Sequence, residues 1–202
     1  MHLAAVGRWH AEVEIDDAAG ARIAIGVRVA LADRAGVVLG GSAVDVATAN
    51  GRTHVEIVGG SGGLSRTLAA RHYLSTPWAT IARDMVADAG EALDPASVLT
   101  GTPARFTRAA VVGTTALASL PFSWRVTPAG LVRIGEVGYP ADTGALRALD
   151  YDRDRRVTTC AVDGLEILPR TTRGAVRVSQ VRYMVDTKAR ALVWETEAEA
   201  EA

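Results

Sequence analysis

One stretch of the chain has the residue spacing of a serine nucleophile. The sequence Gly59-Gly60-Ser61-Gly62-Gly63 satisfies the pattern G-x-S-x-G, in which a strained turn exposes a serine hydroxyl for attack on a carbonyl. The preceding residues, VEIV, predict the strand that such a turn needs. A reactive serine also needs a histidine base and a carboxylate that orients the histidine. A small serine hydrolase that uses Ser61 is therefore one candidate function.

The positions of the histidines argue against that chemistry. His72 is the only histidine after Ser61, and no acidic residue lies between the two, so the hydrolase order of serine, acid and histidine does not occur. His54 precedes the serine, but no His-Gly-Gly segment supplies an oxyanion loop. The other explanation for the glycines is a tight connection in which several residues need positive φ. We favour this explanation, which makes Ser61 a turn residue.

Phosphate and metal binding are also poorly supported by the residue spacing. The glycines lack the Lys-Ser/Thr pair of a P-loop, and no G-x-G-x-x-G opens a helix. Asp150, Asp152 and Asp154 begin like a calcium loop, but Arg155 stands at the glycine position and Ala161 at the position of the bidentate glutamate. The sequence therefore assigns no catalytic, cofactor-binding or metal-binding residue and predicts no cofactor.

The composition of the chain argues against several classes of protein. The 202 residues carry 22 basic and 23 acidic side chains, so no net charge draws the chain to nucleic acid. Cys160 is the only cysteine, which excludes an internal disulfide and a thiolate metal site. The first residues, MHLAAVGRWHAEVEID, predict no signal peptide. The uncharged run at 109–122 is too short and too polar to span a membrane.

A local excess of arginine near the C-terminus gives another candidate function, a nucleic-acid-binding module. Residues 153–190 include nine basic and four acidic side chains. The basic residues are Arg153, Arg155, Arg156, Arg170, Arg173, Arg177, Arg182, Lys188 and Arg190. Tyr151, Tyr183 and Trp194 could stack on bases. A solvated or subunit-facing surface explains the same pattern.

The elements before the glycine-rich stretch are predicted to be strands. Residues 8–58 alternate apolar and polar side chains with the period of half-buried strands, and Asn50-Gly51 predicts a tight hairpin turn. The apolar face of the first strand consists of Trp9, Ala11, Val13 and Ile15. Four or five short antiparallel strands of this kind predict a small barrel or sandwich.

Two helices are expected in the middle of the chain. Ser75-Thr76-Pro77 predicts a helix start with a hydroxyl cap and proline at the first helical position, and Gly90 predicts its end. The expected apolar face consists of Trp78, Ile81, Met85 and Ala89. Residues 106–120 predict a second helix, which Pro121 ends.

The C-terminal third is predicted to return to strands. Residues 123–134 predict a hairpin and residues 141–154 a loop. The last strands are expected at 156–168, 175–185 and 189–195. The strand at 175–185 has no dry face, as expected of a strand that meets something on both sides.

These elements predict an α+β chain that is mainly β, with two small antiparallel β-barrel or sandwich regions flanking a two-helix insert. The predicted division is an N-terminal β region at 1–63, a helical insert at 64–122 and a C-terminal β region at 123–195. The acidic tail at 196–202 is expected to be disordered.

The order of these motifs resembles one family, the baseplate hub proteins of phage tails. The segment YLSTPWATIARDMVADAGE, which starts at Tyr73, is similar to a short helix of this family with its glycine stop. Arg108 precedes a small-residue segment, and the hairpin at Trp124-Arg125-Val126 follows, as in the late-control D-type proteins and the hub half of type VI secretion spikes. The chain resembles a reduced hub, since family members are often much longer.

The resemblance implies an architectural function without catalysis. Hub subunits of this family form a ring, usually a trimer, that links the tail tube to the central spike. The implied partners are copies of the chain, tail-tube or tape-measure proteins, the spike and other baseplate proteins, with no membrane and with nucleic acid only passing through a lumen. The implied location is the tail baseplate of a virion, assembled in the host cytoplasm. Exposed strand edges that pair with neighbouring copies would suit such a ring.

Overall fold

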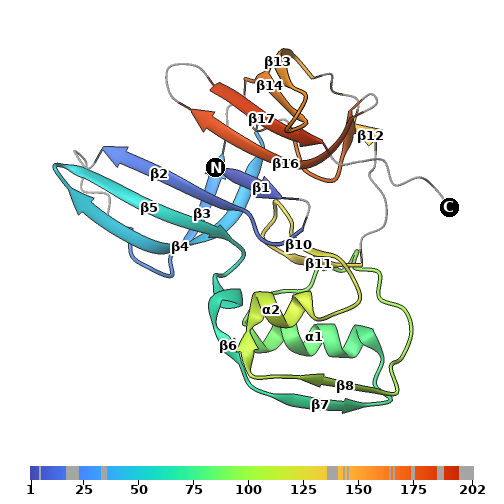
Figure 1. The fold of residues 1–202 in the computed structure, drawn as a ribbon. Coiled ribbons are helices and arrows are strands. Elements are labelled where there is room, and N and C mark those ends of the chain that lie inside the picture. Colours follow the sequence, from blue (N-terminus) through green and yellow to red (C-terminus); the bar gives the residue numbers. More distant parts are fainter. Residues whose placement is uncertain are drawn as a thin grey trace. The chain divides into compact units, whose positions relative to one another are not determined.

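Figure 1 shows the fold of the chain in a computed structural model. The structure describes residues 1–4, 6–16, 23–32, 36–135, 141, 142, 144, 146–163, 165, 167–173, 176–185 and 189–195. The chain divides into two compact units. The first comprises Met1–Ala5, Ala32–Val38 and Gly138–Ala202, and the second comprises Val6–Leu31 and Leu39–Val137. The predicted division at residues 63, 122 and 195 stays a prediction, and the acidic tail lies outside the described residues.

The larger sheet of the second unit has the strand order β2-β5-β4-β3. Its strands are β2 His10–Asp16, β3 Arg28–Ala32, β4 Val38–Ala49 and β5 Arg52–Gly59. Asn50 and Gly51 have φ values of 53° and 73° and form the predicted turn between the antiparallel strands β4 and β5. The predicted alternation is also confirmed, because Trp9 and Ala11 are buried while Glu12 is exposed.

Three small antiparallel ribbons, two α-helices and one 3-10 turn follow in the described residues of the second unit. β6 Thr67–Leu68 pairs with β9 Val111–Val112, β7 Arg71–Leu74 with β8 Arg105–Arg108, and β10 Trp124–Val126 with β11 Val132–Ile134. The last of these is the predicted hairpin. The helices are η2 Gly63–Ser65, a 3-10 turn, and α1 Trp78–Asp88 and α2 Gly113–Ala118. The β7–β8 ribbon runs alongside α1 (Figure 1).

Helix α1 has the predicted buried face but a different start. Ile81, Met85 and Ala89 are buried. Pro77 takes the N-cap position itself, and no side chain caps the helix. The Thr76 hydroxyl, predicted as a cap, donates instead to the carbonyl of Leu74 at 3.0 Å. The predicted hydroxyl cap is therefore wrong, because the Thr76 hydroxyl bonds to the end of the preceding strand, β7, and not to the helix.

The end of α1 is where the sequence predicts it. Gly90 has a φ of 74°, a left-handed conformation that favours glycine. The N–H of Gly90 donates to the carbonyl of Ala87, and the N–H of Glu91 donates to that of Val86, at 2.8 and 2.9 Å. This pair of bonds is a Schellman motif, which satisfies the last carbonyls of the helix.

The helix predicted at 106–120 is wrong in its first half. Residues 105–108 form strand β8 and residues 111–112 form strand β9, so α2 covers only Gly113–Ala118. The reason is tertiary: the aromatic and β-branched residues of this segment pair with β7 and β6, which lie more than thirty residues earlier. Such pairing overrides a local helical pattern.

The first unit contains a sheet with strands in the order β13-β14-β17-β16-β1. Its elements are β1 His2–Ala4, β12 Ala141–Asp142, β13 Ala148–Asp152, β14 Val157–Ala161, β15 Thr172–Arg173, β16 Val176–Val185 and β17 Ala189–Glu195. The loop predicted at 141–154 is wrong, since β13 pairs there with β14. The strand predicted at 156–168 is shorter, and the last two strands lie as predicted.

Strand β16 has a dry face, which corrects the prediction for residues 175–185. Its pairing with β17 shifts register between Val178 and Gln180, so Ser179 is an extra residue on this strand. A bulge changes the phase of the side-chain alternation. Val178 and Val181 are therefore both buried, whereas Gln180 and Arg182 are exposed.

The predicted class, α+β and mainly β, is confirmed. The strands of the described residues form open sheets and short ribbons that do not close, so the barrel alternative for the predicted barrel or sandwich regions is wrong. No helix in the described part of the chain is long and apolar enough to cross a membrane.

Candidate functional site

The glycine-rich segment that holds Ser61 forms a turn against the end of α1. Gly60 and Gly62 have φ values of 82° and 81°. Two backbone N–H groups of the turn donate to one carboxylate: Ser61 N lies 2.8 Å from Glu91 Oε2, and Gly63 N lies 2.9 Å from Glu91 Oε1. We call residues 59–63 together with Glu91 the glycine clasp.

The Ser61 hydroxyl takes part in the same contact. It donates to the carbonyl of Gly90 at 3.0 Å. A nucleophilic serine instead donates to a base, and none of the hydrogen bonds of Ser61 in the described residues reaches an imidazole. His72 lies on β7, with its Nδ1 3.0 Å from Thr107 Oγ1, and His54 is exposed on β5. The structure therefore does not assemble the serine hydrolase site.

Two of the glycines are favoured for different reasons: Gly63 by the close approach of a main-chain carbonyl, and Gly60 by its positive φ and the nearby Glu91 carboxylate. A Cβ at Gly63 would lie 1.7 Å from the carbonyl oxygen of Ala89. At Gly60, which has positive φ, a Cβ would lie 2.6 Å from Glu91 Oε2. The glycines thus allow the main chain of the turn to reach the end of α1. This geometry supports the turn that the sequence analysis favoured.

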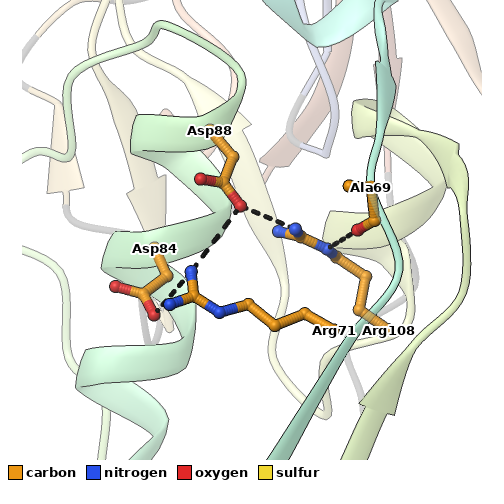
Figure 2. Close-up of polar contacts among 5 residues, drawn as sticks. All are labelled: Ala69, Arg71, Asp84, Asp88 and Arg108. Atoms are coloured by element: carbon orange, nitrogen blue, oxygen red, sulfur yellow. Dashed lines mark hydrogen bonds and ion pairs between the residues drawn. The ribbon is translucent and has the colours of Figure 1, made fainter.

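A second polar cluster joins α1 to the β7–β8 ribbon (Figure 2). The side chain of Arg108 is 1% exposed; its Nη2 lies 2.6 Å from Asp88 Oδ2, and its Nε donates to the Ala69 carbonyl at 2.9 Å. Arg71 Nη1 lies 3.2 Å from Asp84 Oδ2 and 3.9 Å from Asp88 Oδ2. We call Arg71, Asp84, Asp88 and Arg108 the arginine cluster.

The arginine cluster explains two acidic residues that α1 alone would disfavour. Asp84 and Asp88 are four residues apart, so their like charges repel. Asp88 is also the last residue of α1, where the helix dipole disfavours an anion. Arg71 and Arg108 offset both effects. The buried guanidinium of Arg108 in turn depends on Asp88, because an unpaired buried charge is strongly destabilising.

One aromatic ring lies beside this cluster, and other aromatic rings pack at the start of α1. The guanidinium of Arg71 lies 5.4 Å from the centre of the Tyr73 ring. Trp78 packs edge-on against Phe106 and Phe122, with ring centres 5.2 and 5.9 Å apart. The aromatic residues and the arginine cluster together hold α1 to the ribbon.

Six of the residues that carry the family resemblance lie on α1 and the β7–β8 ribbon. They are Tyr73, Trp78, Ile81, Asp84, Met85 and Arg108. In the sequence Arg108 is recognisable only as a motif position, and its pairing with Asp88 was not predicted. The available signal was the pair of aspartates at helical spacing on α1, which needs a cation from another element.

The arginine excess near the C-terminus is not one exposed surface. Arg170 and Arg173 are buried, which corrects their assignment to a nucleic-acid-binding face. Tyr183 is also buried; its hydroxyl donates to the Ile167 carbonyl at 2.6 Å and accepts the Ile167 N–H at 2.7 Å. It is therefore unavailable for stacking on a base. Lys188 lies outside the described residues.

Two of the three aspartates that resemble a calcium loop accept hydrogen bonds from neighbouring backbone N–H groups. Asp150 Oδ1 accepts the N–H of Tyr151, and Asp152 Oδ1 accepts the N–H groups of Asp154 and Arg155. Arg155 Nε also lies 3.7 Å from Asp152 Oδ2. Across the residues that the structure describes, no group of three or more His, Cys, Asp or Glu side chains is arranged to hold a metal ion.

Several solved structures are similar to this chain, among them a phage tail protein and a type VI secretion component. No protein-family profile and no curated protein matches the sequence. The 43 kDa tail protein of prophage MuSo2 from Shewanella oneidensis is 8% identical, with a TM-score of 0.67 over 97% of this chain and 92% of that chain. The E. coli c3393 protein, a type VI secretion component with structural similarity to the T4 tail proteins gp27 and gp5, is 10% identical, with a TM-score of 0.60 over 94% of this chain and 70% of that chain. The chain thus has the fold of these phage-tail and type VI secretion proteins, as the sequence resemblance predicts.

Proposed function

We propose that the chain is a structural subunit of a phage tail, or of a related contractile injection machine, that forms a hub ring linking the tail tube to the central spike. The observation that carries the proposal is the fold shared with the Shewanella prophage tail protein over nearly the whole of both chains. The similarity to a type VI secretion component supports the wider class of injection machines. The expected location is the baseplate end of the tail.

The proposed partners are those of a connecting ring. They are copies of the chain, which we expect to form a trimer, together with tail-tube or tape-measure proteins, the spike and other baseplate proteins. The glycine clasp and the arginine cluster support a passive role, because they use Ser61, Glu91 and Asp88 to fix one element against another. A ring subunit under load needs such fixed elements.

The first experiment measures the assembly of the purified full chain. Mass photometry and negative-stain electron microscopy should show a ring with about three times the 21.1 kDa mass of one chain. Immunogold labelling of particles should place the chain at the tail tip. A chain that stays monomeric at every concentration and never joins a particle would count against the hub ring.

A serine variant separates this proposal from the hydrolase alternative. Ser61→Ala removes one hydrogen bond to Gly90 and should still assemble. Wild type and Ser61→Ala are compared for assembly and for hydrolysis of a p-nitrophenyl ester. An esterase activity that disappears in the variant, with assembly unchanged, would support the hydrolase instead.

A further inference from the structure

The acidic side chains of residues 59–135 all have partners within that segment, which the structure describes without a gap. There are four such residues. Asp84 and Asp88 belong to the arginine cluster, and Glu91 receives two N–H groups in the glycine clasp. Asp94 Oδ2 lies 2.7 Å from Arg133 Nη2, and its Oδ1 accepts the N–H of Ala96. Each carboxylate of this segment is therefore already paired with a group of the same segment.

Several arginine side chains of the same segment have no such partner among the described residues. The side chains of Arg66, Arg83 and Arg105 are exposed and have no ion pair or hydrogen bond among the described residues. Arg71, Arg108 and Arg133 are paired with the aspartates. The free charge of the segment is consequently positive, which favours an anionic partner.

One of these free arginines lies beside a prominent apolar side chain. Tyr73 is buried toward α1, so the strand alternation places His72 and Leu74 on the opposite face of the β7–β8 ribbon. Leu74 is paired in register with Arg105, and His72 with Thr107. We call His72, Leu74, Arg105 and Thr107 the outer ribbon face. Leu74 is 71% exposed, more than any other large apolar side chain in the described residues.

The backbone around Leu74 is fixed. Its carbonyl accepts the hydroxyl of Thr76 at 3.0 Å. Ser75 has a φ of 44°, and its N–H donates to the carbonyl of Ala104 at 3.0 Å, which closes this end of the ribbon. A side chain presented by a fixed backbone loses little conformational freedom on binding. The exposure of Leu74 thus suits a contact with another molecule.

We infer that the outer ribbon face is a docking surface for an acidic segment of another protein. A carboxylate of the partner pairs with the planar guanidinium of Arg105, and an apolar side chain next to that carboxylate covers Leu74. A protein is favoured over nucleic acid because the free arginines are few, the most exposed side chain of the face is the aliphatic Leu74, and the face holds no Phe, Tyr or Trp on which bases could stack. This inference stands on the charges of the segment and does not depend on the ring.

The test uses the full chain and a peptide of defined chemistry. A fluorescein-labelled peptide of alternating leucine and glutamate is titrated with the chain and followed by fluorescence anisotropy at two salt concentrations. We expect binding that weakens with salt, and no binding of the matched leucine–lysine peptide. Arg105→Glu should weaken binding at least about tenfold, and Leu74→Ser about fivefold.

Two matched variants make the test specific to this face. Arg66→Glu and Arg83→Glu carry the same change of charge elsewhere on the segment and should weaken binding less than about twofold. Equal weakening by all three reversals would reveal a general charge effect and overturn the proposal. Failure of the acidic peptide to bind, or tighter binding of an oligonucleotide that Arg105→Glu abolishes, would also overturn it. If Arg105→Glu changes the thermal unfolding midpoint, Arg105→Gln replaces it.

Discussion

The glycine clasp and the arginine cluster engage carboxylates at the same end of α1 by different means. In the clasp, Glu91 receives two backbone N–H groups. In the cluster, Asp88 receives two guanidinium groups, of which that of Arg108 is buried. A main-chain donor can approach only where side chains are absent, whereas a side-chain donor brings a charge that must be matched. The glycine clasp therefore tolerates no added side-chain volume, and the arginine cluster tolerates no unpaired charge.

The largest expected effect comes from filling the space of the clasp. Gly63→Ala should lower the free energy of unfolding by at least about 4 kcal/mol, or prevent folding, because the new Cβ would lie 1.7 Å from the Ala89 carbonyl oxygen. The control is Gly51→Ala, at a positive φ but with open space around the Cβ, which should cost about 1 kcal/mol. Urea unfolding measures both. Equal losses in the two variants would contradict the steric explanation.

The next effect comes from removing the charge partner in the cluster. Asp88→Ala leaves the guanidinium of Arg108 buried without its counterion and should cost about 3 kcal/mol of unfolding free energy. Asp84→Ala is the matched control on the same helix. Its partner Arg71 is half exposed, so the loss should be about 0.5 kcal/mol. A small loss in both variants would show that Arg108 is hydrated in solution.

Removing the carboxylate of the clasp should cost less than removing that of the cluster. Glu91→Ala leaves two partly buried N–H groups without their acceptor, which should lower the unfolding free energy by about 1 to 2 kcal/mol. Glu91→Gln keeps one acceptor oxygen and should lose about half as much. A loss in Glu91→Ala greater than that in Asp88→Ala would reverse the ranking of the two sites.

Sequence patterns predicted the features of these regions that depend on neighbouring residues. Asn50-Gly51 forms its turn because both residues accept positive φ, and Gly90 ends α1 for the same reason. The apolar face of α1 follows from the helical period. In each case the physical cause lies within one or two turns of chain, so no knowledge of the fold was needed.

The features that the sequence did not predict depend on distant partners. Residues 105–108 form strand β8 because they pair with β7, which lies more than thirty residues earlier in the chain. The dry face of β16 depends on a bulge at Ser179, which only the pairing with β17 reveals. The ion pair between Asp88 and the buried Arg108 joins residues 20 positions apart in the chain. A periodic pattern contains no information about which distant element supplies the partner.

The smallest expected effect concerns Tyr73, whose ring lies beside Arg71 in the arginine cluster. Its hydroxyl is buried and has no hydrogen-bond partner in the described residues. Burial raises the pKa of Tyr73 above its usual value of 10.0, although the nearby Arg71 and Arg108 oppose this shift. Above about pH 10 the unfolded chain loses this proton while the folded chain keeps it, so the free energy of unfolding falls as the pH rises.

Tyr73→Phe removes this dependence on pH. At neutral pH the variant should match the wild type within about 1 kcal/mol, because the substitution removes no hydrogen bond. Urea unfolding between about pH 7 and about pH 11 should show the variant gaining relative to the wild type only at the alkaline end. The difference between the two proteins isolates Tyr73 from the other groups that titrate in that range. A difference that stays constant with pH would mean that the guanidinium groups of Arg71 and Arg108 cancel the effect of burial on the pKa of Tyr73.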